Sequence, residues 1–361
     1  MNKVKLIAIH LPQFHPIPEN DQWWGQGFTE WTNVVKASPR FREHYQPHLP
    51  ADLGFYDLRL EENRIAQAEL ARQYGIHGFC YYHYWFNGKR LLNRPLDDLL
   101  ASHKPDFPFM LCWANENWTR RWDGKDQEVL MHQEYNEEDD IRQMQFLCER
   151  FFADQRYIRI SNKPFFVMYR PALNPRMRKT IDTWRTVALK CGIGELYLGY
   201  MRSSDDGISL QESGFDCAIE FQPDFGDLSP RLNENTWNRL LRKLGVRDSA
   251  FIDNRIFDYR DYAKKMMTER KITPLLFPGI TPMWDNAARR QKGATIFAYS
   301  SPEAYGHWLR HIVESYEKVE VNPRFIFINA WNEWAEGNHL EPCQRWGRQY
   351  LEVTKKVLDH A

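Results

Sequence analysis

Eight short apolar runs, each rich in β-branched or aromatic residues, recur along this chain and constrain its fold more than any other feature. Runs that are hydrophobic almost throughout, rather than alternating with polar residues, are typical of strands buried on both faces of a parallel sheet. The expected strands are Val4–Leu11, Gly78–Tyr84, Phe109–Ala114, Pro164–Tyr169, Leu196–Met201, Cys217–Phe221, Pro274–Pro278 and Phe325–Ala330.

Helix-period segments separate these runs. Leu58–Tyr74 has apolar residues at helical spacing, and Gly75 follows it as a helix-ending glycine. Similar segments are Asp140–Phe152, Met177–Cys191, Tyr259–Lys271 and Pro302–Lys318. Such alternation predicts βαβ units, and eight of them close a barrel. We therefore predict an α/β fold, a (β/α)₈ TIM barrel, forming a single domain over residues 1–361 with long rim loops.

A doubly wound open sheet is the alternative architecture. It would need a glycine-rich phosphate turn after an early strand, and the sequence contains neither G-x-G-x-x-G nor G-x-x-x-x-G-K-[ST]. Two long connections, Pro12–Asp57 and Gln222–Arg255, follow expected strands. Both should lie on the C-terminal rim, where barrels build their sites.

Aromatic residues are unusually frequent, with 14 Trp and 15% aromatic residues overall. Because sugar rings stack their apolar faces on indole and phenol rings, this favours a carbohydrate site, although many of these rings must fill the core. Lys and Arg balance Asp and Glu at 48 each, which argues against nucleic acid or an anionic membrane surface as partner.

The sequence contains no uninterrupted apolar stretch long enough for membrane insertion. Six widely spaced cysteines fit free thiols in a reducing compartment. The N-terminal residues contain no signal-peptide pattern, so we expect a cytoplasmic protein, or a processed form if a signal has been removed.

Two glutamates follow the last expected strand, in the run Trp331-Asn332-Glu333-Trp334-Ala335-Glu336-Gly337. Cleavage of a glycosidic bond needs one protonated carboxyl group and one ionised carboxylate. Packing against Trp331 or Trp334 would raise the pKa of one glutamate, and a polar neighbour such as Asn332 would keep the other charged. Glu333 and Glu336 are thus the candidate catalytic residues.

The third expected strand ends in a similar way, with Trp113, Asn115, Glu116 and Trp118 close together. Three roles are open for Glu116: acid/base with Glu333 as nucleophile, as in ordinary retaining barrel glycosidases, a ligand for a sugar hydroxyl, or a partner of Arg120 or Arg121.

Further polar and aromatic residues follow other strands and are candidates for substrate binding. They are His10, Gln13, His15, Trp24 and Trp31 in the first rim loop, Tyr82, His83 and Tyr84 on the second strand, and Glu220, Trp284 and Asp285 after the sixth and seventh strands. Side chains alternate along a strand, so about half of those on the second strand should face inward.

Other chemistries are less well represented in the sequence. It contains no G-x-S-x-G elbow, no H-E-x-x-H and no Asp-x-Asp motif of the kind that holds Mg²⁺ or Mn²⁺ against a diphosphate. We expect no cofactor and no metal, and an oligo- or polysaccharide as partner.

Four long motifs resemble the WbsX-type family of bacterial surface-polysaccharide gene clusters. They are LPQFHPIPENDQWWGQGFTEWTNV, GFCYYHYWFNGKRLL, WANENWTRRWDG and WNEWAEGNHLEP. Members are commonly labelled glycosyltransferases, yet they look like family-99 glycoside hydrolases, the endo-α-mannosidases. The resemblance covers residues 3 to about 355 and implies a (β/α)₈ barrel without a metal requirement. The Leu-Pro-Gln-Phe-His element departs from the mannosidase pattern.

The family-99 hydrolases have an Asn-Glu-Trp-x-Glu-Gly element, matched here by Asn332 to Gly337. By that match Glu336 would be the general acid/base. Glu333 would be a base toward the sugar 2-hydroxyl, giving retention through a 1,2-anhydro sugar. The spacing fits this, because acids three residues apart can hardly flank the anomeric carbon as the usual pair does, about 5 Å apart.

Three functions are therefore open. The leading one is a retaining glycoside hydrolase or transglycosylase, endo-acting, on a bacterial polysaccharide or mannan-like α-glycan. The second is a glycosyltransferase of O-antigen or capsule (lipopolysaccharide) biosynthesis, against which the missing diphosphate cradle counts. The third is a non-catalytic glycan-binding barrel, for which paired glutamates would be superfluous.

Overall fold

The computed structural model describes residues 4–120, 125–204, 206–234, 237, 240, 249–290, 292–316 and 318–360. Its main sheet is a nearly closed barrel of parallel strands in the order β12-β10-β9-β8-β4-β2-β1-β15-β13. The strands are β1 (Lys5–His10), β2 (Ile76–Phe86), β4 (Phe109–Trp113), β8 (Lys163–Met168), β9 (Tyr197–Arg202), β10 (Cys217–Glu220), β12 (Leu276–Phe277), β13 (Gly279–Ile280) and β15 (Phe325–Ile328). The predicted barrel is confirmed, and each of the eight expected runs contributes a strand.

One short segment closes the barrel. β12 pairs with β10 and β13 pairs with β15, and Pro278 separates the two halves because it has no backbone N–H to donate. At Gly279 the chains approach so closely that a Cβ atom would lie 1.8 Å from the backbone oxygen of Glu220. The seventh strand therefore requires glycine at this position.

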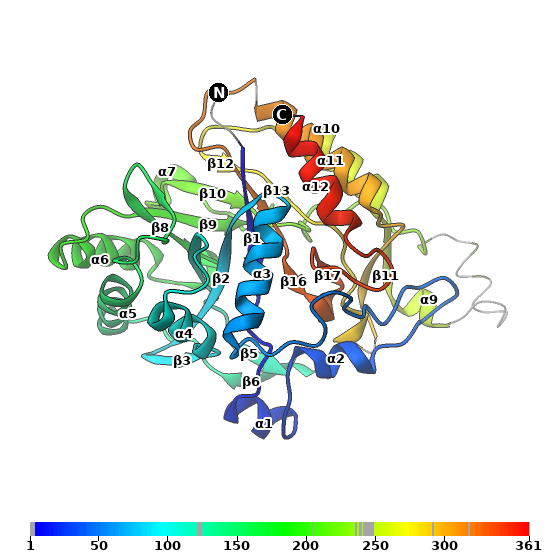
Figure 1. Cartoon of the computed structure of the whole chain (residues 1–361), viewed down its shortest axis with the longest axis horizontal. Helices are drawn as coiled ribbons and strands as arrows, with labels where there is room; N and C mark the ends of the chain where they lie inside the picture. Colours follow the sequence, from blue (N-terminus) through cyan, green and yellow to red (C-terminus); the bar gives the residue numbers. More distant parts are fainter. Residues whose placement is uncertain are drawn as a thin grey trace.

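Helices surround the barrel (Figure 1). The larger ones are α3 (Glu61–Gln73), α4 (Arg94–Ser102), α5 (Glu137–Arg150), α6 (Met177–Lys190), α10 (Tyr259–Glu269), α11 (Pro302–Tyr316) and α12 (Gln349–Asp359). Five of these are the predicted helices. Gly75 follows α3 with φ +84°, as expected for a residue just beyond a helix end. α4 and α12 were not predicted, although both bury an apolar face.

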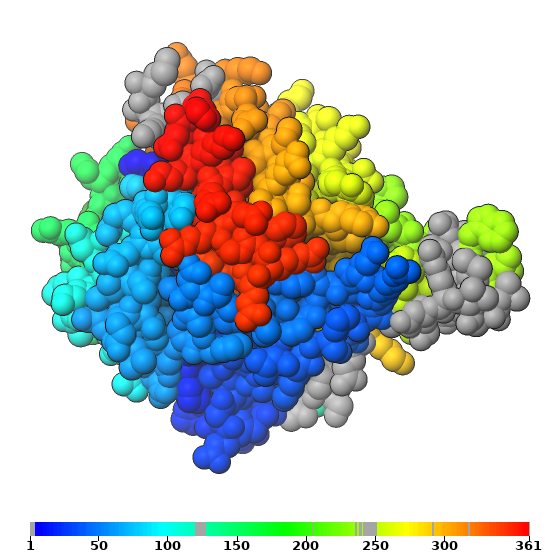
Figure 2. Space-filling model, turned by 45° about the vertical axis from the view of Figure 1, so that its right-hand side comes forward, coloured from blue at the N-terminus to red at the C-terminus, as the bar shows by residue number. Residues whose placement is uncertain are grey.

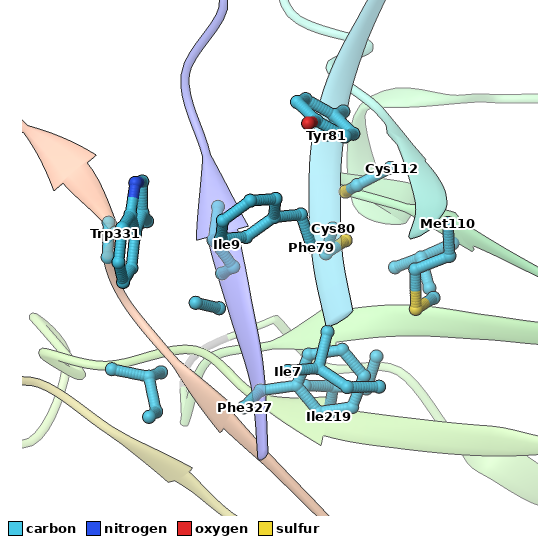
Figure 3. Packing of buried hydrophobic residues seen from close by; sticks show 14 of the residues in the cluster. Ile7, Ile9, Phe79, Cys80, Tyr81, Met110, Cys112, Ile219, Phe327 and Trp331 are labelled. Atoms are coloured by element: carbon cyan, nitrogen blue, oxygen red, sulfur yellow. The ribbon is translucent and has the colours of Figure 1, made fainter. Parts of the chain in front are cut away.

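The core fills the barrel and the space under the helices. Leu6, Ala8 and Phe327 are almost completely buried. Figure 3 shows Phe79 of β2 and Ile9 of β1 on the side toward Trp331, whereas Ile7 lies beside Phe327 and Ile219. The ring centroids of Phe79 and Trp331 lie 5.2 Å apart. No helix in the described part of the chain is both long and apolar enough to cross a membrane.

Short elements form the rim at the end toward which β1 runs (Figure 1). The first rim loop contains α1 (Pro18–Trp24) and α2 (Glu30–Lys36), two helices that its sequence did not predict. The other rim and loop elements are β3 (Lys89–Leu91), β5 (Trp118–Arg120), β6 (Lys125–Met131), β7 (Arg159–Ile160), η2 (Pro171–Leu173), α7 (Leu210–Ser213), α9 (Ser249–Asp253), β11 (Arg255–Asp258), η3 (Asn286–Ala288), β14 (Thr295–Ala298), β16 (Asn332–Glu333), η4 (Trp334–Glu336) and β17 (Asn338–His339).

The first rim loop is fixed against the C-terminal segment. Ala51 N–H donates to the Pro342 oxygen at 2.9 Å, and Gln344 N–H donates to the Leu49 oxygen at 2.9 Å. Figure 2 shows these blue and red-orange segments in contact on the surface. This packing holds one wall of the rim in place.

Candidate active site

The chain after β15 folds into a tight hairpin that presents both glutamates. β16 pairs antiparallel with β17, with Asn332 opposite His339 and Glu333 opposite Asn338. The 3-10 turn η4 connects them, and Gly337 ends it with φ +53°. The backbone N–H of Asp285 donates to the backbone oxygen of Glu336 at 2.7 Å, which ties this turn to the loop after the seventh strand. Glu333 and Glu336 therefore face the same cavity.

A single guanidinium joins the two carboxylates. Arg289 donates from Nη1 to Glu336 Oε1 at 2.6 Å and from Nη2 to Glu333 Oε2 at 3.0 Å. Its Nη2 also donates to Glu30 Oε1 at 2.8 Å. That oxygen of Glu30 accepts from Ala335 N–H as well, at 2.9 Å. Glu30 is fully buried at the first turn of α2, so the rim loop contributes a third carboxylate.

The pKa values of Glu333 and Arg289 in this cluster are shifted from their ordinary values. Burial raises the pKa of Glu333, the charge of Arg289 lowers it, and the charges of Glu336 and Glu30 raise it again. Together these effects bring the pKa of Glu333 to about 8. Burial disfavours the charge of Arg289, but the three carboxylates outweigh this and hold its pKa well above the usual value. Arg289 stays charged, and Glu333 holds a proton near neutral pH.

The cavity beside this cluster has a volume of about 400 Å³, within the range of small-molecule sites. Nine of the predicted site residues line it: Gln13, Trp24, Tyr82, Tyr84, Glu116, Trp118, Trp284, Glu333 and Glu336. It is also lined by residues that were not predicted for the site from the sequence: Tyr169, Arg170, Phe221, Phe225, Arg255, Asn286, Arg289 and Arg290. The cavity thus combines aromatic walls with charged groups.

Glu116 follows β4, which is separated from β15 by β2 and β1 in the sheet. Its Oε1 is 3.4 Å from Arg170 Nε, and Arg170 lies over the rings of Tyr169 and Phe221. Arg121 and the side chain of Arg120, the partners considered for Glu116, lie outside the described part of the chain. Glu116 therefore has an ion-pair partner that its sequence neighbourhood did not suggest.

Four of the predicted tryptophans lie in packed surroundings. Trp113 donates from Nε1 to the Trp85 oxygen at 3.2 Å and meets Trp184 edge-on. Trp31 packs against Trp334, and Trp331 is fully buried. Trp334 stacks on His339 with ring centroids 3.8 Å apart. The contacts of Trp31 and Trp334 support the rim loop and the hairpin, whereas Trp113 packs against α6.

The three predicted histidines are buried. Burial lowers the pKa of His10 to about 3 and that of His15 to about 4, and it holds the pKa of His83 well below the usual value. His10 Nε2 lies 3.2 Å from Gln67 Oε1. His83 stacks beside Phe146. The imidazoles of these three histidines are therefore neutral, and they are packed in the interior of the protein.

Asn115 and Asn332 hold neighbouring chain segments together. Asn115 Oδ1 accepts from Arg170 N–H at 2.7 Å, and its Nδ2 donates to the Arg170 oxygen at 2.8 Å. Asn332 makes the same pair of bonds to Leu11, at 2.8 and 3.1 Å. Asn332 therefore links the hairpin to β1, and Arg289, rather than Asn332, is the polar partner of the carboxylates.

Replacing Asn332 by Ala should lower the free energy of unfolding by about 2–3 kcal/mol, because it leaves buried backbone groups of Leu11 without partners. Urea denaturation monitored by tryptophan fluorescence measures this. Gln73→Ala, at an exposed helix position, should change stability by less than about 0.5 kcal/mol. Equal effects of the two changes would contradict the structural role of Asn332.

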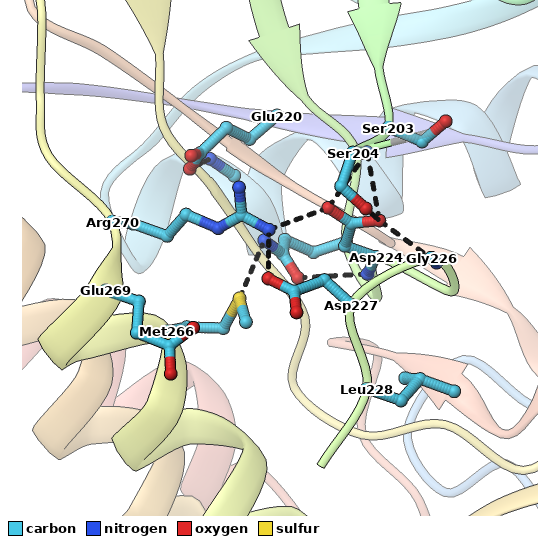
Figure 4. A network of polar contacts seen from close by, with 12 residues as sticks. Ser203, Ser204, Glu220, Asp224, Gly226, Asp227, Leu228, Met266, Glu269 and Arg270 are labelled. Atoms are coloured by element: carbon cyan, nitrogen blue, oxygen red, sulfur yellow. Dashed lines mark hydrogen bonds and ion pairs between the residues drawn. The ribbon is translucent and has the colours of Figure 1, made fainter. Parts of the chain in front are cut away.

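Glu220 and Asp285 belong to other networks. Glu220 lies at the end of β10 near Arg270, which pairs with Asp224 at 2.8 Å and Asp227 at 2.9 Å (Figure 4). Asp285 accepts from Gln46 Nε2 at 2.7 Å and lies 2.7 Å from His44 Nε2. Asp285 lines a second cavity of about 1050 Å³, which shares the wall residue Trp284 with the first.

Comparison with known proteins agrees with this architecture. The family model "Glycosyltransferase WbsX" matches residues 6–354. Two Xanthomonas campestris pv. campestris proteins, both described as "Uncharacterized protein WxcX", are 41% identical over 359 residues, 99% of this chain. The chain spans about half the length of these relatives.

Solved structures share the fold. A "Glycoside hydrolase-like protein" aligns with TM-score 0.61 at 14% identity, covering 99% of this chain and 94% of that one. The GH99 endo-alpha-mannosidase from Bacteroides thetaiotaomicron aligns with TM-score 0.57 at 12% identity, covering 98% of this chain and 96% of that one. The fold is thus glycoside-hydrolase-like, and by the match over nearly its whole length the chain belongs to the WbsX family.

Proposed function

We propose that this chain is a retaining glycoside hydrolase or transglycosylase that acts within a bacterial polysaccharide or mannan-like α-glycan. The supporting observation is that Glu333 and Glu336 meet on one guanidinium in an aromatic-walled cavity at the C-terminal end of the barrel. In characterised barrel enzymes this end holds the active site.

In the proposed first step Glu336 donates its proton to the leaving glycosidic oxygen. Glu333 takes the proton of the neighbouring 2-hydroxyl, and O2 attacks the anomeric carbon as the C1–O bond breaks. The product is a 1,2-anhydro sugar. In the second step Glu336 removes a proton from water or an acceptor hydroxyl, whose oxygen attacks C1. The C1–O2 bond breaks at the same time, and Glu333 returns its proton to O2. Two inversions give net retention.

The cluster is suited to this exchange because the reaction needs one proton shared by two carboxyl groups. Three carboxyl groups contact Arg289, so negative charges would outnumber positive ones among these four residues if all were ionised. One bound proton relieves this excess. The reactive form has that proton on Glu336 and Glu333 ionised.

The pH dependence of the reaction follows from this requirement. Because the cluster loses its proton near pH 8, kcat/KM should fall with unit slope as pH rises through about 8. Initial rates on a cleavable glycan between pH 5 and 10 measure this. A kcat/KM that rises through pH 8 would contradict the need for a shared proton.

The family's name supports a second candidate, a glycosyltransferase of surface-polysaccharide synthesis. A glycan panel with mass-spectrometric product analysis, beside calorimetric titration with sugar nucleotides and Mg²⁺ or Mn²⁺, separates the two. We expect shortened or transglycosylated glycans with retained anomeric configuration. Tight metal-dependent binding of a sugar nucleotide would favour the transferase, and glycan binding without any product would favour a binding protein.

A further inference from the structure

One wall of the active-site cavity is basic. It is formed by the start of β11, by η3 and the loop after it, and by the start of β14, and it contains Arg255, Asn286, Arg290, Gly293 and Thr295. Arg255 lies directly opposite Thr295 in the β11–β14 pair. The loop that contains Arg290 is the one that presents Arg289 to the two glutamates. The basic wall is therefore adjacent to the proposed reaction centre.

Arg255 differs from the other cavity arginines in its surroundings. Arg170 lies beside Glu116, and Arg289 contacts Glu30, Glu333 and Glu336. The buried Nε of Arg255 has no hydrogen-bond partner, and no carboxylate within the described ranges contacts its guanidinium. Its ring contact is with Phe257, at 5.9 Å.

Two charged neighbours act on Arg255: Arg231, which is itself paired with Glu234 at 3.7 Å, and Arg290. Burial lowers the pKa of Arg255, and the charges of Arg231 and Arg290 lower it further. A partly buried guanidinium that has no carboxylate partner is stabilised when an anion approaches. Charge complementarity therefore points to a negative group in the space that this wall encloses.

We propose that Arg255 and Arg290 bind a negatively charged substituent of the glycan, either the carboxylate of an acidic sugar or a phosphate ester. This inference deepens the proposed function and rests on it, since it makes the substrate an acidic polysaccharide. The planar guanidinium of arginine matches both anions, donating two parallel N–H bonds to one carboxylate or phosphate. A neutral hydroxyl would leave the guanidinium of Arg255 without a counter-charge.

The test measures binding with probes that cannot be cleaved. Isothermal titration calorimetry of the whole chain compares glucuronate with glucose, which differ in charge at C6, and inorganic phosphate is a third probe. Wild type should bind glucuronate or phosphate more tightly than glucose. Arg255→Gln should weaken binding of that anion about tenfold or more, whereas Arg255→Lys should lose less. Arg178→Gln, an exposed arginine paired with Asp182, is the matched control and should leave it unchanged.

The relative affinities for glucuronate and phosphate distinguish the two sources of negative charge. Equal anion affinity in Arg255→Gln and wild type, or absence of anion binding by wild type, would overturn the inference. Because no probe is hydrolysed, the result is independent of catalysis. A protein that cleaves neutral glycans but binds no anion would refute this inference alone. Arg255-dependent anion binding without glycan cleavage would refute the proposed function instead.

Discussion

Glu336→Gln should reduce the rate of glycan cleavage by about 10²–10⁴-fold, because the amide cannot donate a proton to the leaving oxygen. The side chain keeps nearly the same shape, and it can still accept a hydrogen bond from Arg289. Binding of the glycan, measured by calorimetry, should therefore remain close to that of the wild type. Initial-rate measurements with mass-spectrometric detection of products give the loss in kcat.

Glu116→Gln is the matched control, because it removes another carboxylate that lines the cavity. Its rate should fall by less than about tenfold, since we assign no proton transfer to Glu116. If Glu116→Gln instead abolished cleavage while Glu336→Gln retained it, the ordinary two-carboxylate mechanism with Glu116 as acid would replace the one proposed here.

Arg289→Met should lower the free energy of unfolding by about 3–5 kcal/mol, because it leaves the buried carboxyl groups of Glu30 and Glu333 without their cationic partner. The deficit should depend on pH. Without Arg289 the pKa of Glu333 rises further, so protonation at pH 5 relieves the repulsion and ionisation toward pH 9 increases it. Urea denaturation at both pH values measures this difference.

Glu30→Gln provides a second measurement at the same cluster. In this background Arg289→Met should cost less than in the wild type, since one fewer buried carboxylate loses its partner. A double-mutant cycle gives the coupling energy between the two residues. A coupling of zero, or an Arg289→Met variant as stable as the wild type at pH 7, would show that the guanidinium is not needed to balance the cluster.

The eight-stranded barrel could be predicted from the sequence because its signals are local. Each strand is an apolar run of the right length, and each of five helices shows a 3.6-residue period, so the α/β alternation was visible without any contact information. Gly75 after α3 is a further local signal that the structure confirms. The division of the seventh strand into β12 and β13 was not visible, because it depends on the approach of Gly279 to Glu220 across the sheet.

The placement of Glu333 and Glu336 in one cavity was also predictable, since both leave the same strand within a single turn. Arg289 and Glu30 were not, because they are 259 residues apart and meet only when the first rim loop packs over the loop after the seventh strand. The available signals were a glutamate among aromatic residues and an Arg289-Arg290 pair in a rim loop.

Sequence alone therefore determined the eight apolar runs of the barrel, five of its helices and the pair of acids, because periodicity and chain proximity fix them. The tertiary structure decided which aromatic residues line the cavity, which histidines are buried and which charges surround the acids. Side chains on irregular rim loops have no fixed period, so their directions depend on contacts between segments far apart in the chain. For this reason the residues that set the protonation of Glu333 became visible only in the folded protein.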